Sequence, residues 1–376
     1  MSSSSFKYKP IKWMILGCIL LSIVYLGKLN MDYVLQNQYE YEPFDIKSKM
    51  KEGMENLGLS SSHEEPPSVE FPFKNIYNEQ GQKINIIAIS APFRETNHEL
   101  LYESYKNSGW GMIGISSYLE FPNQIDNPYE DKFHQEQKHD YPSMVTAWIH
   151  CFRDPGYKLQ YSGLPLLMLT EADLKNVDHY KPDPNIQKEY DFMYVCLDDN
   201  EHCTPGWNWY IRSWDLAKKC LEIMCSKYHL KGIIVGRTNC EFTDKCTGIV
   251  KTVPFLPFHE FQTEMQKCRF LFTPNVSDAS PRVITEAMLY NMPVLVNSNI
   301  VGGWSNVIPG VTGEFFTSEH DITPMLDKIV SPNSKYTPRD WYVNNRGLEH
   351  SGKQLAKFLK DNYPKINYPD MEYAYI

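Results

Sequence analysis

The chain has 376 residues and a net charge of -9, and hydrophobic residues make up 42% of it. At roughly 100–200 residues per domain, this length predicts two domains with additional segments. The apolar fraction is enough for packed cores and excludes a disordered chain. The acidic balance argues against nucleic-acid binding, because the sequence has no run of Lys or Arg to contact a phosphate backbone.

The first distinctive segment is 13–27, a block of 15 residues without a charge and with lysines on both sides. As a helix it would be about 22 Å long, which is short for a bilayer core of about 30 Å but usable if the flanking lysines reach the interface. A cleaved signal peptide is the alternative. No small-x-small cleavage site follows the block, which favours an uncleaved transmembrane anchor. The three lysines before it predict a type II orientation, with residues 1–12 in the cytoplasm.

The next segment, 29–83, holds ten Asp and Glu against five Lys and is predicted to be a solvated stem. Among the cysteines that follow, two pairs flank short loops, and either pair could close a disulfide: Cys196 with Cys203, or Cys240 with Cys246. No Cys or His cluster in the sequence has zinc spacing, so no metal site is predicted.

From residue 84 on, short apolar runs alternate with helical patterns. Such buried strands, separated by helices, imply a parallel sheet covered on both faces. In the first half, strands are expected at 84–90, 110–116, 143–150 and 164–170, and a helix at 98–109.

A polar, proline-containing link at 179–190 interrupts this pattern, which then restarts. In the second half, strands are expected at 191–197, 230–236, 249–256, 270–275 and 292–297, and helices at 208–229, 259–269 and 281–291. The repeat on either side of the link predicts an α/β fold with two doubly wound, Rossmann-like domains, 84–185 and 186–330, facing a cleft. A helical tail is expected over 331–376.

The segment 270–316 carries the predicted chemistry. Its strand ends in a turn of small polar residues, and the next helix is expected to begin at Pro281 with Ser280 as its N-cap. The free N–H groups and positive end of that helix would form an anion site suited to a phosphate. One carboxylate before the helix, Asp278, and one within it, Glu286, could bind two hydroxylated parts of one ligand.

This segment resembles the donor domain of retaining GT-B glycosyltransferases, particularly the large family 4 group. Those enzymes carry Glu-x7-Glu, Ala-Met, Pro-Val-Val, Gly-Gly and Gly-x-Thr-Gly in this order. The chain has Asp278-x7-Glu286, Ala287-Met288, Pro293-Val294-Leu295-Val296, Gly302-Gly303 and Gly310-Val311-Thr312-Gly313. The resemblance covers about residues 190–316 and implies an N-terminal acceptor domain followed by a C-terminal nucleotide-sugar domain.

The resemblance also implies roles for individual residues. Glu286 would hold the ribose hydroxyls of the donor, and Asp278 would contact the donor sugar. Arg212 aligns with the family's Lys that grips the diphosphate, whereas Trp207 stands where the family has an Arg. We therefore expect Arg282, at the start of the helix, to supply the missing cation.

In the N-terminal half, His150 closes an expected strand, at a place where related enzymes often keep a His that faces the donor sugar. The predicted catalytic residues are therefore Asp278, Glu286 and His150. The predicted donor-binding residues are Arg212, Asn208, Ser280, Arg282, Val283, Gly302 and Gly303.

The expected function is transfer of a sugar from a nucleotide-diphosphate donor to a glycan, glycoprotein or lipid, with retention of configuration and without a metal or other cofactor. The anchor suggests a location in the Golgi or endoplasmic reticulum, with the catalytic part in the lumen. One alternative is a metal-dependent GT-A enzyme that uses Asp198 and Asp199. The other is a non-catalytic, membrane-anchored glycan-binding or scaffold protein.

Overall fold

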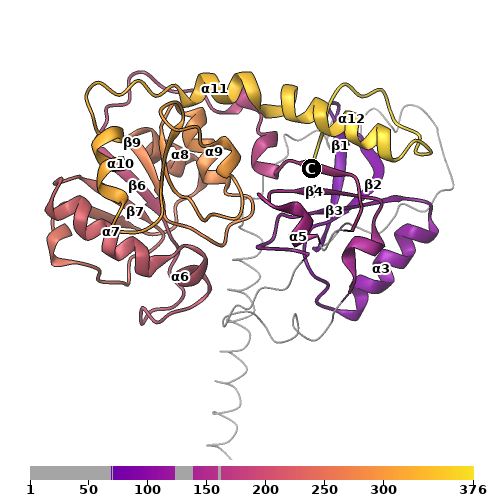
Figure 1. The fold of residues 1–376 in the computed structure, drawn as a ribbon, viewed down its shortest axis with the longest axis horizontal. Coiled ribbons are helices and arrows are strands. Elements are labelled where there is room, and N and C mark those ends of the chain that lie inside the picture. Colours follow the sequence, from indigo (N-terminus) through magenta and orange to yellow (C-terminus); the bar gives the residue numbers. More distant parts are fainter. Residues whose placement is uncertain (1–68, 70, 123–138, 160–161) are drawn as a thin grey trace, which may run out of the picture. The chain divides into compact units, whose positions relative to one another are not determined.

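The computed structural model describes residues 69, 71–122, 139–159 and 162–376 (Figure 1). The predicted cytoplasmic tail, the predicted anchor at 13–27 and most of the predicted stem lie outside these residues. In the described part of the chain, no helix is both long and apolar enough to cross a membrane. The membrane anchor therefore stays a prediction.

The described residues form two six-stranded sheets (Figure 1). The first sheet has the order β12-β1-β2-β3-β4-β5, and its strands are β1 (Phe73–Asn78), β2 (Lys83–Ile89), β3 (Gly111–Ile115), β4 (Ala147–His150), β5 (Leu166–Met168) and β12 (Ala374–Tyr375). The second sheet has the order β11-β10-β9-β6-β7-β8, and its strands are β6 (Tyr190–Val195), β7 (Gly232–Val235), β8 (Val250–Val253), β9 (Cys268–Thr273), β10 (Val294–Asn297) and β11 (Gly313–Phe316). All pairings in the second sheet are parallel, as are those from β2 to β5 in the first. The predicted α/β class with two mostly parallel sheets is confirmed.

Apolar side chains cover both faces of each sheet, as expected for parallel strands. The α-helices of the described residues are α3 (Thr96–Asn107), α5 (Pro155–Lys158), α6 (Trp207–Ile211), α7 (Trp214–Ser226), α8 (Phe258–Gln266), α9 (Arg282–Leu289), α10 (Ile322–Ile329), α11 (Pro338–Asn345) and α12 (Lys353–Asn362). In the second sheet, α7 and α10 pack against one face, and α8 and α9 pack against the other. In the first sheet, α12 covers one face and α3 the other.

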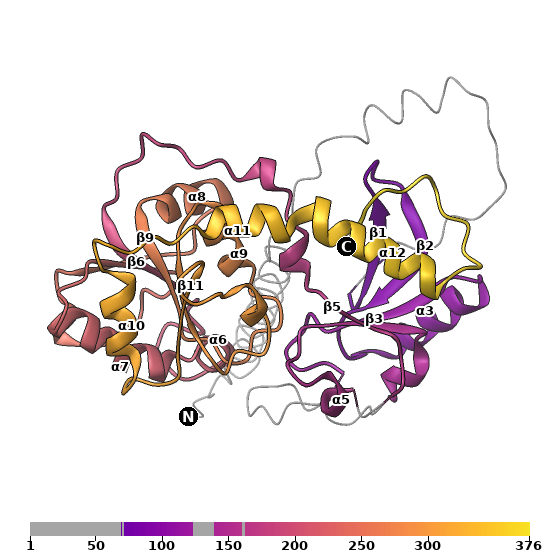
Figure 2. The ribbon, with the colours of Figure 1, turned by 45° about the horizontal axis from the view of Figure 1, so that its top comes forward.

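The first sheet extends beyond the range predicted for it. Strand β1 lies within the predicted stem, so the stem prediction is wrong for these residues. It pairs antiparallel with β2 on one side and with β12 on the other, where Tyr77 faces Tyr375. The C-terminal segment runs from α11, beside α9, to α12, beside β12 (Figure 2). The first half therefore contains both ends of the described chain.

The long helix predicted at 208–229 is broken into α6 and α7. The break is at Ser213, which has a left-handed backbone with φ of 53°. A residue other than Gly rarely adopts this conformation, and it cannot continue a right-handed helix. As a result, α6 is a single short turn that ends at Arg212.

Candidate functional site

The second sheet reverses its strand order between β6 and β9. The chain runs from β6 outward to β7 and β8, and then from β9 outward to β10 and β11 on the other side. In open parallel sheets, ligands bind outside the carboxyl ends of the strands at such a switch point. Two segments leave the sheet here, α6 after β6 and the loop 274–281 after β9. Together they form the expected ligand-binding edge.

An ion pair joins these two segments. The guanidinium of Arg212 contacts the carboxylate of Asp278, which also accepts a hydrogen bond of 3.3 Å from the side-chain amide of Asn275. The hydroxyl of Tyr194 donates to the backbone carbonyl of Arg212 at 2.7 Å and so fixes the end of α6. Burial lowers the pKa of Arg212, but Asp278 and other neighbours raise it above its usual range, so the guanidinium stays charged. The structure thus brings the predicted residues Arg212 and Asp278 together.

Three buried polar atoms have no hydrogen-bond partner among the described residues and lie on or beside the two segments that this pair joins: Ser213 Oγ, Thr273 Oγ1 and Asn275 Oδ1. Ser213 directly follows Arg212, and the other two lie at the end of β9. A buried polar atom without a partner costs about 1–3 kcal/mol, and such atoms are rare in folded proteins. Their place on or beside the segments that one ion pair joins indicates a binding site for a polar ligand.

The helix that follows this loop, α9, begins one residue later than predicted. Pro281 is the N-cap residue and Arg282 the first helical residue. Ser280 is not the N-cap; its hydroxyl accepts a hydrogen bond from the backbone N–H of Ala172 at 3.3 Å. Val283 packs against the hydrophobic core on one face of the second sheet. The N-cap prediction for Ser280 is therefore wrong.

Glu286 belongs to a different cluster from Asp278. It is 3% exposed, and its Oε1 lies 2.6 Å from the ammonium of Lys175 and 3.5 Å from the hydroxyl of Tyr180. Lys175 is also buried and follows the short helical turn η2 (Glu171–Leu174). No local pattern in the sequence singles out Lys175, because its partner is 111 residues away.

Arg282 is paired with a carboxylate from the first half. Its guanidinium lies 2.9 Å from Glu171, which also contacts the ammonium of Lys74 on β1 at 2.5 Å. Burial raises the pKa of Glu171, but the two cations outweigh this effect and lower it to about 2. Arg282 thus balances a protein carboxylate in the structure, while its predicted contact with a diphosphate stays a prediction.

His150 ends β4, as predicted, and is buried. Burial lowers its pKa below the usual 6.5, so the imidazole is neutral near pH 7. Its Nδ1 has no hydrogen-bond partner among the described residues. The residues just after it, Cys151 and Phe152, pack against Ala279. The end of β4 therefore meets the loop that carries Asp278.

The two glycines at 302–303 allow the backbone to approach that loop closely. The N–H of Gly302 donates to the carbonyl of Asp278 at 2.8 Å. A Cβ on Gly302 would lie 1.8 Å from the carbonyl oxygen of Ala279, and one on Gly303 would lie 2.4 Å from Pro281. Gly303 also has a φ of 73°. The Gly-Gly motif therefore positions the loop that carries Asp278.

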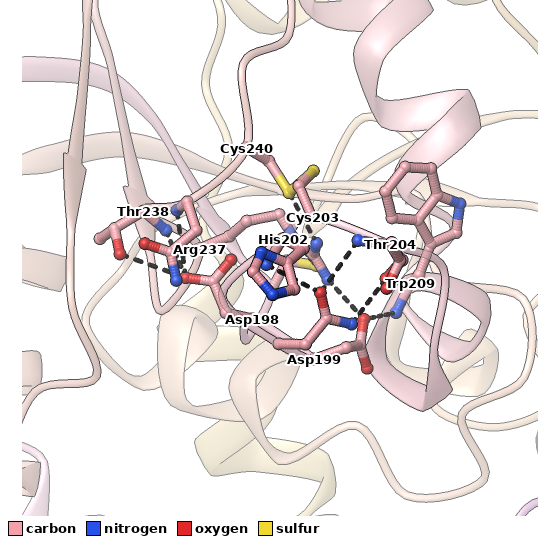
Figure 3. The surroundings of a disulfide bond; sticks show 12 residues. Asp198, Asp199, His202, Cys203, Thr204, Trp209, Arg237, Thr238 and Cys240 are labelled. Atoms are coloured by element: carbon pink, nitrogen blue, oxygen red, sulfur yellow. Dashed lines mark hydrogen bonds and ion pairs between the residues drawn. A yellow bond between two sulfur atoms is a disulfide. The ribbon is translucent and has the colours of Figure 1, made fainter.

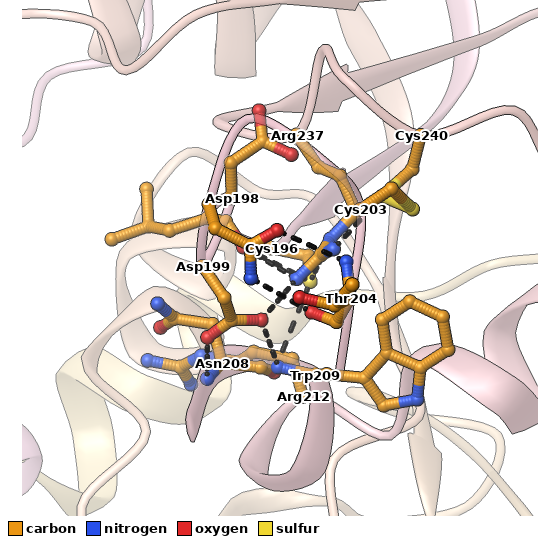
Figure 4. A network of polar contacts seen from close by, with 12 residues as sticks. Cys196, Asp198, Asp199, Cys203, Thr204, Asn208, Trp209, Arg212, Arg237 and Cys240 are labelled. Atoms are coloured by element: carbon orange, nitrogen blue, oxygen red, sulfur yellow. Dashed lines mark hydrogen bonds and ion pairs between the residues drawn. A yellow bond between two sulfur atoms is a disulfide. The ribbon is translucent and has the colours of Figure 1, made fainter. Parts of the chain in front are cut away.

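Both aspartates of the GT-A alternative contact other groups of the protein, Asp198 as shown in Figure 3 and Asp199 as shown in Figure 4. Asp199 accepts hydrogen bonds from the backbone N–H groups of Asn208 at 2.6 Å and Trp209 at 2.9 Å, and it pairs with Arg237. Asp198 accepts bonds from the backbone and hydroxyl of Thr238. These contacts are those of a helix cap and a loop anchor, so the geometry does not support a metal-binding pair. Asn208, a predicted donor ligand, is held here by its backbone.

The disulfides differ from both predicted pairs. Cys203 is bonded to Cys240 (Figure 3), and Cys225 is bonded to Cys246. Cys196 is buried and carries a free thiol. The prediction considered only cysteines close in sequence, whereas the carboxyl ends of β6 and β7, which are neighbours in the sheet, bring Cys203 to Cys240.

No protein-family model matches the sequence, and no curated protein matches it. Solved structures do match. The apo form of the lipopolysaccharide outer core galactosyltransferase WaaB has a TM-score of 0.50 and 13% identity, over 74% of this chain and 75% of that chain. HepE from Anabaena in complex with UDP-glucose has a TM-score of 0.52 and 12% identity, over 71% of this chain and 77% of that chain. HepE in complex with UDP and glucose has a TM-score of 0.52 and 13% identity, over 71% of this chain and 76% of that chain. At such identities the likeness shows the fold alone. This chain has the two-sheet GT-B fold of these glycosyltransferases.

Proposed function

We propose that this protein is a glycosyltransferase that moves a sugar from a nucleotide-diphosphate donor to a glycan, glycoprotein or lipid acceptor. The observation that carries the proposal is the Arg212–Asp278 pair with its unpartnered polar neighbours at the switch point of the second sheet. A cation, a carboxylate and several buried hydrogen-bonding atoms are the chemistry that a phosphorylated sugar requires. HepE, which shares the fold, was solved with UDP-glucose.

In this proposal, each cluster binds one part of the donor. Arg212 stabilises the negative charge of the leaving diphosphate, supported by the N-terminus of α9. Asp278 contacts hydroxyls of the transferred sugar, and His150 approaches the same sugar from the end of β4. Glu286 accepts hydrogen bonds from the ribose through its second oxygen, because its contacts with Lys175 and Tyr180 both use Oε1.

The remaining predicted residues shape the donor site. Gly302 and Gly303 hold the loop of Asp278, Val283 packs the first turn of α9 against the core, and Ser280 connects this loop to Ala172. Asn208 lies in the turn that ends at Arg212. Arg282 links α9 to Glu171 in the first half.

We further propose that the reaction retains the configuration of the sugar and needs no metal. An arginine and helix N–H groups supply the positive charge that a divalent cation would otherwise provide. The test is the activity of the purified protein in EDTA, which should stay within about twofold of the untreated enzyme. Complete loss that Mn²⁺ restores would contradict metal independence.

The donor can be identified with the full-length protein purified in detergent. Each UDP- and GDP-sugar is added in turn, and the melting temperature is measured, because a ligand that binds only the folded state raises it. The matched pair of variants is Arg212→Ala, at the proposed site, and Arg269→Ala, which removes a 67% exposed arginine near the start of β9. Stabilisation should disappear only in Arg212→Ala. If no nucleotide sugar stabilises the protein but glycans do, the proposal gives way to the scaffold alternative.

The residues before 69 are proposed to hold a type II membrane anchor at 13–27, which would place the enzyme in the Golgi or endoplasmic reticulum. The 15 uncharged residues and the lysines before them support this. Alkaline extraction of membranes tests it. The full chain should stay in the membrane pellet, and a chain in which Leu20 and Leu21 are replaced by Arg should be released.

A further inference from the structure

Arg237 is an arginine almost completely buried in the second half. It follows β7, is 1% exposed, and donates hydrogen bonds to several groups (Figures 3 and 4). Its Nη2 donates to the carbonyl of Leu197 at 2.7 Å and to Asp199 at 2.9 Å, and its Nε and Nη1 lie 3.1 Å from the sulfurs of Cys196 and Cys240. Burying a guanidinium costs several kcal/mol unless its donors are matched. Here the donors of Arg237 have acceptors in the segments that follow β6 and β7, so this one side chain connects the two segments.

Asp199, which pairs with Arg237, also contacts α6. Its two carboxylate oxygens accept from the first backbone N–H groups of that helix, at Asn208 and Trp209. Gly206 allows the close approach, because a Cβ there would lie 2.7 Å from both Cβ and Cγ of Asp199. A helix of five residues has almost no stability of its own. The position of α6 therefore depends on the Asp199 cap.

The same helix ends at Arg212, the cation of the proposed donor site. One unbroken series of contacts thus runs from Arg237 through Asp199 and α6 to Arg212 and Asp278. The Cys203–Cys240 disulfide closes the loop around this series, and Cys240 itself accepts from Arg237.

We propose that Arg237 and Asp199 are positioning residues for the donor site, which fix α6 and thereby hold Arg212 where it meets the diphosphate. Neither residue touches the donor. The Cys203–Cys240 disulfide has the same positioning role, because it holds Cys240, which contacts Arg237, against the segment after β6. This inference rests on the proposed function and adds to it the residues that determine donor affinity from outside the site.

The sharpest test is Gly206→Ala, which deletes no contact group. Gly206 has a φ of -151°, which alanine adopts without strain, so the new methyl acts only by displacing Asp199. With UDP as the probe, we expect about tenfold weaker binding in calorimetry, together with a lower melting temperature, because the displaced carboxylate leaves the buried Arg237 less well paired. Asp199→Asn, which keeps an oxygen for one N–H and removes the charge beside Arg237, should weaken binding in the same way.

A double-mutant cycle separates positioning from general damage. In an Arg212→Ala background, Gly206→Ala should weaken UDP binding no further, because its effect passes through Arg212. The disulfides provide a matched control: Cys203→Ser with Cys240→Ser should weaken UDP binding several-fold, and Cys225→Ser with Cys246→Ser should leave it unchanged. The inference would be overturned if Gly206→Ala weakened UDP binding equally with Arg212 present and with Arg212 replaced by Ala. It would also be overturned if both disulfide variants weakened UDP binding equally. If the unaltered protein binds neither UDP nor GDP, the proposed function itself fails, and this inference fails with it.

Discussion

Asp278 and Glu286 lie on one short segment and each pairs with a cation, but their surroundings are opposite. Asp278 is 15% exposed in its side chain, its partner Arg212 is 28% exposed, and the chain segments that carry the pair also hold buried polar atoms without a partner. Glu286 is 3% exposed in its side chain, and Lys175 and Tyr180 close around it. The first pair has unsatisfied hydrogen-bonding capacity beside it. The second pair connects Lys175, the residue after η2, to α9 in the core.

The difference shows that a shared sequence motif does not assign the same kind of role to both of its carboxylates. A partly exposed pair can exchange its partner for a ligand at little cost, because solvent compensates both charges. A buried pair cannot lose one member cheaply, because the other remains as an uncompensated charge. We therefore expect changes at the first pair to affect activity with little loss of stability, and changes at the second to lower stability in addition to any effect on donor binding. The following predictions test this division, from the largest expected effect to the smallest.

Lys175→Met should lower the free energy of unfolding by about 3–5 kcal/mol, because it leaves Glu286 buried without its cation. Urea denaturation followed by tryptophan fluorescence measures this. The double variant Lys175→Met with Glu286→Gln should recover a large part of the loss, since it removes the stranded charge. A loss below about 1 kcal/mol in the single variant would show that the pair is not the structural connection that we describe.

Arg212→Ala should lower kcat/KM for the donor by about 100- to 1000-fold, the usual effect of removing one group that stabilises transition-state charge. Its free energy of unfolding should fall by only about 1–2 kcal/mol, because Asp278 stays in contact with Asn275 and with solvent. Steady-state kinetics and denaturation of one preparation give both numbers. Arg269→Ala serves as the control and should change neither. A variant with full activity and low stability would reverse the division between the two pairs.

Glu171 makes the free energy of unfolding depend on pH. Its pKa is about 2 in the fold, against an ordinary value of 4.5. A carboxyl with a lowered pKa contributes stability that is complete above its unfolded pKa and is lost as the pH falls through the folded pKa. We expect about 3 kcal/mol to be lost between roughly pH 5 and pH 2. Glu171→Gln should remove this part of the pH dependence, while Glu349→Gln, a change at an exposed carboxyl, should keep it. Identical profiles for the two variants would contradict the assignment.

The sequence was sufficient to predict the two parallel sheets and the segment that carries the site. Continuous apolar runs mark strands buried on both faces, and the glycines at 302–303 have a clear steric reason, so both signals are local. Arg212 was predicted from the resemblance to the GT-B donor domain, and Asp278 from that resemblance together with its place just before the helix that follows a strongly patterned strand.

The rest depends on contacts between residues far apart in sequence. Strand β1 was assigned to the stem because its partners are β2 and the distant β12, and its own composition is polar. Lys175 and Arg237 were missed because a buried ion pair has no local pattern in the sequence. The break at Ser213 was missed because nothing in its neighbours predicts a left-handed backbone at a serine.

The smallest expected effect concerns the aromatic stack of Trp207 on Tyr118, whose ring centroids are 6.0 Å apart with planes at 15°. Trp207 begins the helix that ends at Arg212, and Tyr118 follows β3. The stack therefore connects the helix of Arg212 to the first half of the chain. A double-mutant cycle with Trp207→Ala and Tyr118→Ala should give a coupling of about 0.5–1.5 kcal/mol in unfolding. The stacked pair Tyr77–Tyr375, 5.5 Å apart within the first sheet, is the matched control. We expect similar coupling energies for both pairs but a threefold to tenfold rise in donor KM only for Trp207→Ala. If Tyr77→Ala raises the donor KM equally, the Trp207–Tyr118 stack has no special connection to the donor site.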